Sequence, residues 1–253
     1  MDAPLAIHRK IKEHIMPRAN GIKVRDVRIG LGYTAVLLET GQAGVALTFH
    51  QSLRRGCTVF DGLYPLAGRA AVELLSFLES TDKIEMAVAL ATANALANTM
   101  RKDMLEGDIM EHIHVGPEEK VGMVGNFAPM LPRLKEKSSS ILIFEQIERK
   151  QGNLLPEEEA YRLLPQCQVA MITSTSILNR TVEKILSAAQ SCREVILLGA
   201  STPLIPEVFT GTSVTFLSGI IVSRPLDLLR IVSEGGGMPL FKKTIKKVNL
   251  SLR

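Results

Sequence analysis

Helix-like and strand-like hydrophobic patterns follow one another at the start of the chain. Apolar residues recur at helical spacing over 3–16, with Asp2 as the expected N-cap and Pro4 just inside the helix. Two β-like runs then occupy 24–39 and 41–50, and the glycines between them are typical of a hairpin. We therefore expect one helix followed by a two-stranded antiparallel unit.

Two helix-like stretches come after this hairpin. The first covers 65–80, and the second covers 82–100, where Asp82 and Glu85 have the spacing of a capping box. A hairpin followed by helices that can cover it is typical of an α+β unit. The sequence therefore predicts an α+β domain over residues 1–106.

The pattern changes from about residue 119, where short apolar runs alternate with helix-like segments. The runs fall at 120–127, 139–146, 168–175, 193–201 and 213–223. Helices are expected over 156–165 and over 179–191, the latter with Asn179 as its N-cap. Strands that are apolar without alternation are typical of a parallel sheet covered on both faces. We therefore predict a Rossmann-like α/β domain with a mainly parallel sheet over 107–253.

Composition and charge exclude several classes of protein. Of the 253 residues, 46% are hydrophobic and 22% charged, as in a globular chain with a large core. Aromatic residues make up 4%, and the small net charge of +4 comes largely from lysines after residue 241, so nucleic-acid binding by base stacking is not expected. No apolar run approaches the roughly 20 residues that span a bilayer, and the three cysteines form no paired motif. The sequence thus predicts a cytoplasmic protein without nucleic-acid or membrane partners, and it is compatible with a homo-oligomer.

Small and hydroxyl-bearing residues follow the predicted strands of the second domain. The carboxyl ends of parallel strands meet at one edge of a sheet, where ligands bind. Glycines allow a ligand to approach the backbone, and N–H groups with hydroxyls suit phosphate or carboxylate. The alternative is that glycine, serine and threonine are simply common at turns and caps. The candidate residues are Gly122, Gly125, Asn126, Phe127, Glu145, Thr173, Ser174, Thr175, Ser176, Asn179, Gly199, Ser201, Thr202, Pro203, Ser218 and Gly219.

The loop after the first of these strands departs from the dinucleotide fingerprint. Residues 122–127 read G-x-x-G-N-F and not G-x-G-x-x-G, which argues against an ordinary NAD site. Glu145 nevertheless follows Gly125 by 20 residues, about where a dinucleotide fold places the carboxylate that binds ribose. A nucleotide-type ligand is therefore retained as an alternative.

Polar residues of the first domain add to the candidate site. Asn94 and Asn98 share one face of an Ala-rich helix, and two amides on an apolar helix need hydrogen-bond partners. They either bond to neighbouring backbone or face a cleft between the domains. Tyr33 and Thr34, which follow two glycines, are similar candidates.

Metal-binding and nucleophilic motifs are weak. His112 and His114 would share a face of a strand, and carboxylates flank them, but no third ligand has a suitable spacing. A solvated linker is the preferred interpretation of this segment. Cys167 and Cys192 lie beside apolar strands and are expected to be buried, and no hydrolase elbow is present. No catalytic residue is assigned.

Six blocks, in order, carry a resemblance to a known family: GYTAV, NALAN, VGMVGNF, LIFE, MITSTSILNRT and LLGASTPLIPEVF. Together they resemble prokaryotic proteins described as "putative heavy-metal chelation". The resemblance implies a first domain like the small domain of enolase, a Rossmann-like second domain and an active site between them. It also implies a role in metal handling or in making a metal-binding small molecule.

The residues and the resemblance together predict a protein that binds a small molecule in the interdomain cleft, with a role in heavy-metal chelation or in metabolism of a metal-chelating compound. Its cofactor would be a metal, a metal chelate or a nucleotide-type ligand. Two alternatives stay open, namely a nucleotide- or adenosylmethionine-dependent enzyme and a non-catalytic carrier of metal chelates. Shape likeness to enolase implies no lyase chemistry.

Overall fold

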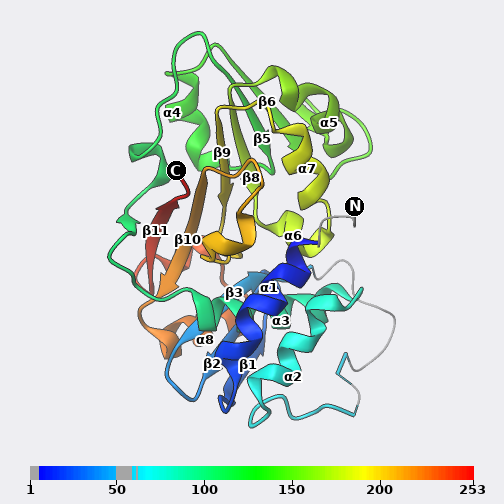
Figure 1. Cartoon of the computed structure of the whole chain (residues 1–253), viewed down its shortest axis with the longest axis vertical. Coiled ribbons are helices and arrows are strands. Elements are labelled where there is room, and N and C mark those ends of the chain that lie inside the picture. The colour runs from blue at the N-terminus through cyan, green and yellow to red at the C-terminus, as the bar shows by residue number, and fades with distance from the viewer. Residues whose placement is uncertain (1–5, 50–58, 61) are drawn as a thin grey trace.

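The computed structural model describes residues 6–49, 59–60 and 62–253. The described chain contains a three-stranded antiparallel sheet and an eight-stranded, mostly parallel sheet. In Figure 1 the small sheet and the first helices occupy the lower half, and the large sheet stands above them. The expectation of a mainly parallel second sheet is confirmed, while the boundary at residue 106 stays a prediction.

The small sheet is a meander of three strands, where the sequence predicted two. It consists of β1 (Val24–Ile29), β2 (Tyr33–Leu38) and β3 (Ala43–Leu47), with β2 in the centre. The long run at 24–39 is split by a turn at residues 30–32. Gly30 is required there, because a Cβ atom at this position would lie 2.2 Å from the backbone oxygen of Val232.

The helices of the first unit are α1 (Ile7–Ile15), α2 (Ala71–Ser76) and α3 (Lys83–Ala97). The predicted cap Asp2 and Pro4 lie outside the described residues. The second predicted helix begins at Ala71 and not at residue 65, since Ala70 is extended and bridges to Lys23. The cap of α3 is confirmed, with the Asp82 carboxylate accepting hydrogen bonds from the N–H groups of Ile84 and Glu85.

Helix α3 is buried on almost all sides. A helix without a polar face must be enclosed by protein, and α3 packs between the small sheet and the second unit. It approaches β3 so closely that a Cβ atom on Gly44 would lie 2.2 Å from the backbone nitrogen of Ala95. The side chains of α3 and of the large sheet belong to one hydrophobic core, which contains Leu90, Val124 and Ile172.

The large sheet has the strand order β4-β11-β10-β9-β8-β5-β6-β7. The six strands from β10 to β7 are parallel, and β11 and β4 add an antiparallel edge. Its strands are β4 (Leu105–Glu106), β5 (Lys120–Val124), β6 (Ser140–Glu145), β7 (Leu154–Pro156), β8 (Val169–Thr173), β9 (Glu194–Leu198), β10 (Phe216–Val222) and β11 (Ile245–Ser251). From β5 the chain runs outward to β6 and β7, and it then returns to place β8 on the other side of β5.

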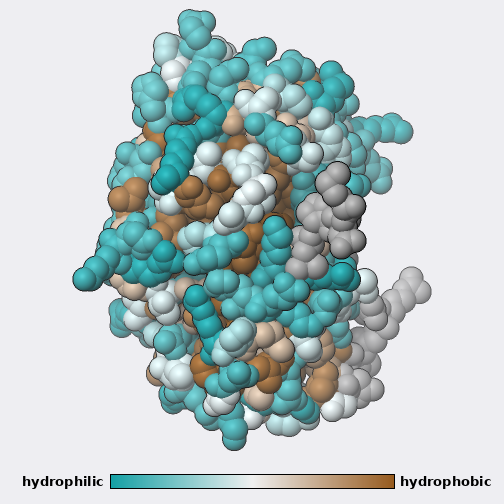
Figure 2. Space-filling model, viewed as in Figure 1, coloured by the Kyte–Doolittle hydropathy of each residue, from teal (hydrophilic) through white to brown (hydrophobic). Residues whose placement is uncertain are grey.

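Helices and turns cover both faces of this sheet. The regular helices are α4 (Leu131–Lys135), α5 (Ala160–Leu163), α6 (Thr175–Asn179), α7 (Val182–Ala188), α8 (Pro225–Ser233) and α9 (Met238–Phe241). Side chains of α5 and α7 pack on one face of the sheet, and α4 packs on the other with the segment 109–115. Figure 2 shows apolar residues gathered near the middle of the visible face, with hydrophilic residues over most of the rest.

Several elements differ from the sequence prediction. The lysine-rich end of the chain forms β11, in which the adjacent Lys246 and Lys247 are exposed and the next three residues are buried. Strand β4 lies just before the histidine segment that was expected to be a solvated linker, and the expected helix at 156–165 is reduced to α5 between short 3-10 turns. Asn179 is the last residue of α6 and not the N-cap of the following helix, which begins after Thr181. No helix of the described residues is long and apolar enough to cross a membrane.

Candidate functional site

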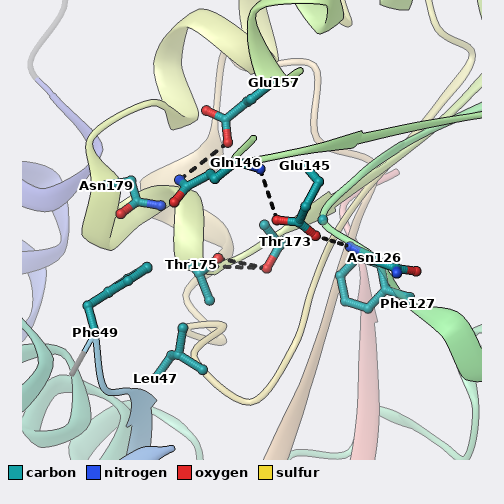
Figure 3. A pocket seen from close by; sticks show the side chains of 11 residues that line it. Leu47, Phe49, Asn126, Phe127, Glu145, Gln146, Glu157, Thr173, Thr175 and Asn179 are labelled. Carbon is teal, nitrogen blue, oxygen red and sulfur yellow. Dashed lines mark hydrogen bonds between the residues drawn. The ribbon is translucent and has the colours of Figure 1, made fainter. Parts of the chain in front are cut away.

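A pocket of about 230 Å³ opens at the carboxyl ends of β5, β6 and β8. Residues of the small sheet's edge and of the large sheet line it together, as Figure 3 shows. The lining residues are Leu47, Phe49, Gly125, Asn126, Phe127, Glu145, Gln146, Glu157, Thr173, Thr175 and Asn179. Strands β6 and β8 lie on opposite sides of β5, so the pocket sits where the chain reverses its direction across the sheet. Ligands of open parallel sheets bind at such a switch point.

The turn after β5 forms one wall of the pocket. Gly125 has φ +90°, a conformation that favours glycine, and a Cβ atom there would lie 2.9 Å from Cβ of Thr173. The next residue, Asn126, donates its backbone N–H to Oε2 of Glu145 at 3.0 Å. This loop therefore directs a backbone donor toward a carboxylate of its own chain, unlike a loop that binds phosphate.

Glu145 ends β6 and stands at the centre of the view in Figure 3. Its Oε1 atom accepts the backbone N–H of Gln146 at 3.0 Å, while its Oε2 atom accepts that of Asn126. A carboxylate offers about four lone-pair positions. Two backbone hydrogen bonds thus fix the orientation of Glu145 and still leave acceptor capacity toward the pocket.

Glu157 contributes a second carboxylate from the turn after β7. Its Oε2 atom accepts a hydrogen bond from Nε2 of Gln146 at 3.4 Å. Burial raises the pKa of Glu157, and the neighbouring negative charges of Glu158 and Glu145 add to this effect, while the hydrogen bond from Gln146 opposes it. Two carboxyl groups therefore line the same pocket.

Hydroxyl groups come from the turn between β8 and α6. The Oγ1 atoms of Thr173 and Thr175 are 2.9 Å apart and form a hydrogen bond. Ser176 donates its hydroxyl to the Thr173 carbonyl oxygen at 2.7 Å, so it caps the turn and does not line the pocket. Ser174 is fully buried behind the pocket, and its Oγ atom has no hydrogen-bond partner.

Asn179 completes the wall at the end of α6. The residue after it, Arg180, has φ 58°, the left-handed conformation that glycine usually provides at a helix end. Its Nη2 atom donates to the carbonyl oxygens of Glu79 at 2.7 Å and Ser80 at 2.6 Å, which belong to the first unit. The guanidinium therefore ties the end of α6 to the helices below it.

Seven of the predicted residues line the pocket: Gly125, Asn126, Phe127, Glu145, Thr173, Thr175 and Asn179. The segment at 199–203 lies elsewhere, because it is packed against the first unit. Ser201 accepts the backbone N–H of Leu47 through its Oγ atom at 2.9 Å, and Thr202 and Pro203 are buried. Gly199 lies beside the Ser174 hydroxyl.

Asn94 of α3 and Asn98, its C-cap, bond to backbone groups that are distant in the sequence. Nδ2 of Asn94 donates to the carbonyl oxygens of Val45 at 2.9 Å and Ser201 at 3.2 Å. Asn98 bonds in the same way to the segment after β9, and neither residue is among those that line the pocket. They hold the two units together.

The remaining candidates of the first unit are also internal. The hydroxyl groups of Thr34 and Thr48 bond to each other at 2.9 Å and are buried. The Tyr33 ring packs edge-on against Phe241, with centroids 5.1 Å apart. Burial also raises the pKa of Tyr33.

Three candidates lie inside strands and not at their carboxyl ends, which corrects the expected strand limits. Gly122 is in the middle of β5, where a Cβ atom would lie 2.4 Å from Cδ2 of Leu164, so packing explains this glycine. Ser218 and Gly219 lie inside β10, which continues to Val222 because it pairs along its whole length with β11. Strand β11 was not predicted from the sequence, and the end of β10 was therefore placed too early.

Four lining residues were not predicted: Leu47, Phe49, Gln146 and Glu157. Gln146 follows Glu145 directly at the strand end and could have been included on position alone. Glu157 was assigned to the first turn of a helix, where acidic residues are common for reasons of the helix dipole. Nothing in the sequence shows that the end of β3 reaches this edge of the other sheet.

His112 and His114 belong to no metal-binding cluster of described residues. Within the described part of the chain, no group of three or more His, Cys, Asp or Glu side chains is placed to hold a metal ion. Nε2 of His112 is 3.0 Å from the Glu106 carbonyl oxygen, and Glu119 pairs with Arg193 at 2.6 Å. Cys167 and Cys192 are buried, and burial raises their pKa values to about 11 and about 12. Cys57 and His50 lie outside the described residues.

Comparison with known proteins gives a consistent result over almost the whole chain. A family model described as "Putative heavy-metal chelation" matches residues 108–251, and a second model with the same description matches residues 12–97. An uncharacterized protein of Methanocaldococcus jannaschii is 26% identical over 260 residues, which cover 97% of this chain and 98% of that protein.

Two solved structures share the fold. A protein with unknown function from Pyrococcus horikoshii matches with a TM-score of 0.85 at 24% identity, over 97% of this chain and 99% of that one. A protein with unknown function from Desulfitobacterium hafniense matches with a TM-score of 0.75 at 21% identity, over 96% and 98%. Both belong to the family whose model matches residues 108–251. Since that model covers more than half of the chain, this protein belongs to the family described as "Putative heavy-metal chelation".

Proposed function

We propose that the chain binds a small molecule in the pocket between its two sheets and acts in heavy-metal chelation or on a metal-chelating compound. The observation that carries this proposal is the position of the pocket. It lies at the switch point of the parallel sheet, and Leu47 and Phe49 of the first unit close it from below. The family description supports the metal-related part of the proposal.

The volume and the lining suit a compact polar ligand. About 230 Å³ is below the range of roughly 300–1,000 Å³ that is usual for drug-sized ligands. Carboxylates, amides and hydroxyls form the upper wall, while Leu47, Phe49 and Phe127 supply apolar surface. Direct coordination of a bare metal ion is the weaker reading, because the described residues offer no cluster of three ligating side chains. A chelator or a metal already chelated fits this lining better.

A nucleotide- or adenosylmethionine-type ligand is the second candidate. Glu145 ends β6 beside the glycine turn after β5, the place where a Rossmann-like domain holds a ribose by its hydroxyl groups. We also propose that the second domain is Rossmann-like. The enolase-like character of the first domain is proposed on the family resemblance alone. The occupied N–H of Asn126 speaks against a phosphate at this loop.

Thermal unfolding in the presence of candidate ligands tests the proposal. The panel contains divalent metal salts, preformed chelates of the same metals with ethylenediamine and with histidine, the metal-free chelators, nucleotides and adenosylmethionine. A ligand at 100 times its dissociation constant stabilises the folded state by about 2.7 kcal/mol, which raises the melting temperature measurably. We expect chelates or chelators to give the largest rise.

A matched pair of variants localises the effect. Thr175→Phe fills the pocket from α6, whereas Thr210→Phe makes the same change at an exposed position. The rise in melting temperature should be lost in the first variant and retained in the second. A panel without any stabilising ligand, or a rise that survives in Thr175→Phe, would contradict binding at this site.

A further inference from the structure

The carboxylates of the pocket have no cationic partner in the described structure. Neither Glu145 nor Glu157 forms an ion pair with any residue whose position is described. The described residues that line the pocket include no lysine, arginine or histidine. Two carboxylates therefore line a partly enclosed space in which no described residue forms an ion pair with either of them.

Two other enclosed carboxylates of this protein are compensated by arginine. Glu194, which is 3% exposed, lies 3.2 Å from the guanidinium of Arg253 and 3.7 Å from that of Arg193. Glu119 receives a bidentate contact from Arg193, with both N···O distances at 2.6 Å. The pocket carboxylates differ from these two, since no described residue forms an ion pair with them, and perturbed titratable groups are typical of a binding site.

The charged form of Glu157 is destabilised in the pocket. Removing a carboxylate from water favours its neutral form, and nearby negative charge has the same effect. Both influences raise the pKa of Glu157. A positive group that enters the pocket would relieve this cost, so the site is prepared for positive charge and unfavourable for an anion.

Resting on the function proposed above, we propose that the ligand carries a protonated amino group, which binds between the carboxylates of Glu145 and Glu157. An ammonium group has three N–H donors. Glu145 retains lone pairs after its two backbone hydrogen bonds, and Glu157 retains them after its bond from Gln146. The ammonium group thus completes the hydrogen bonding of both carboxylates.

Aromatic rings reinforce the preference for an organic cation. Phe49 and Phe127 both line the pocket, and an ammonium group over an aromatic face is attracted by the ring quadrupole. Phe49 already makes this interaction with Lys83, whose Nζ atom is 4.7 Å from the ring centroid. Two carboxylates and two rings suit an alkylammonium better than a hard metal ion, which requires about six oxygen ligands.

Three probes of equal shape separate charge from size: 1-aminobutane, 1-butanol and butyrate. Saturation-transfer NMR on the full chain detects their contact with the protein even at millimolar affinity, and calorimetry gives the dissociation constant. We expect contact from the ammonium probe alone. Its dissociation constant should rise about tenfold or more in Glu145→Gln and in Glu157→Gln, as for the loss of a charged hydrogen-bond partner.

Glu148→Gln is the matched control, since it removes an exposed carboxylate close in sequence to the pocket residues. The dissociation constant should stay unchanged in this variant. An equal loss in all three variants indicates attraction to the surface and overturns the proposal. The same holds if affinity is unchanged in Glu145→Gln and Glu157→Gln, or if the ammonium probe makes no contact.

The outcomes also separate this inference from the proposed function. Equal contact from 1-butanol or butyrate, if lost in Thr175→Phe, overturns the ammonium assignment and supports a pocket for small molecules. Failure of the chelate and nucleotide panel, together with specific binding of 1-aminobutane, overturns the proposed function and retains an ammonium site. The first result therefore tests the ammonium assignment, and the second tests the proposed function.

Discussion

The side-chain oxygen of Asn98 accepts the backbone N–H of Leu204 at 2.9 Å, across the contact between α3 and the segment after β9. Its Nδ2 atom donates to the carbonyl oxygens of Thr202 at 3.0 Å and Ile220 at 3.3 Å. One buried asparagine therefore satisfies three backbone groups of the second unit. Buried backbone groups that lose their partners are costly, which makes this residue a structural joint between the units.

Asn98→Ala should lower the free energy of unfolding by about 2–4 kcal/mol, because it strands these buried backbone groups. Urea unfolding followed by circular dichroism measures the change. Asn153→Ala, in an exposed turn, is the control and should change stability by less than about 0.5 kcal/mol. Similar values for the two variants would contradict the role of Asn98 as a joint.

Gly44→Ala should destabilise the protein by about 3 kcal/mol or more, at the upper end of overpacking effects. The added methyl group would lie 2.2 Å from the nitrogen of Ala95 and 2.3 Å from the oxygen of Ala91, so α3 would have to move away from β3. Gly32→Ala is a suitable control, since no atom lies within 4 Å of its Cβ position and its φ is not positive. A melting temperature equal to that of the control would show that α3 can shift without cost.

Arg180 can be dissected with two substitutions. Arg180→Ala loses the bonds to Glu79 and Ser80 and keeps the left-handed backbone, while Arg180→Gly loses the same bonds and relieves the strain. Both variants should be less stable than the wild type, and the glycine variant should exceed the alanine variant by about 1 kcal/mol. Denaturant unfolding measures both values. Equal stability of the two variants would mean that the backbone at this position is not strained.

Acid should weaken the fold through Glu119. The hydrogen bonds from Arg193 lower the pKa of Glu119 from its ordinary value of 4.5 to about 2, with a further contribution from the Gly116 N–H. A depressed pKa contributes stability that is fully present above pH 4.5 and is lost as pH falls toward 2. The difference in unfolding free energy between the wild type and Glu119→Gln should shrink over this interval. A difference that stays constant from pH 6 to pH 2.5 would exclude the ion pair as its source.

Glu157→Gln should stabilise the ligand-free protein at neutral pH. Burial raises the pKa of Glu157, so its charged form opposes folding at pH values above its folded pKa, and this penalty disappears as pH falls below 4.5. The gain should be about 1 kcal/mol or less after solvent screening is considered. Glu148→Gln, at an exposed position, should leave the melting temperature unchanged. A loss of stability in Glu157→Gln at pH 8 would contradict this account of the pocket.

Local patterns were sufficient for much of the architecture. Five of the seven strands after residue 119 and the helix that begins behind Asp82 were correctly predicted, because burial on both faces and capping leave direct marks in the sequence. Irregular elements were missed where the local pattern is ambiguous. The run at 24–39 carries no sign that Gly30 turns against α8, and β11 contains two adjacent exposed lysines before its buried half.

The sequence by itself determined most of the strand ends, and residues at three of these ends line the pocket. Only the tertiary structure decided which strand ends are neighbours, since the order of β8, β5 and β6 depends on pairing between distant segments. The tertiary structure also places the segment after β9 against α3, away from the pocket. Glu157, in contrast, lies in the pocket wall. Position along the chain is local information, whereas proximity is fixed by the packing of the whole core.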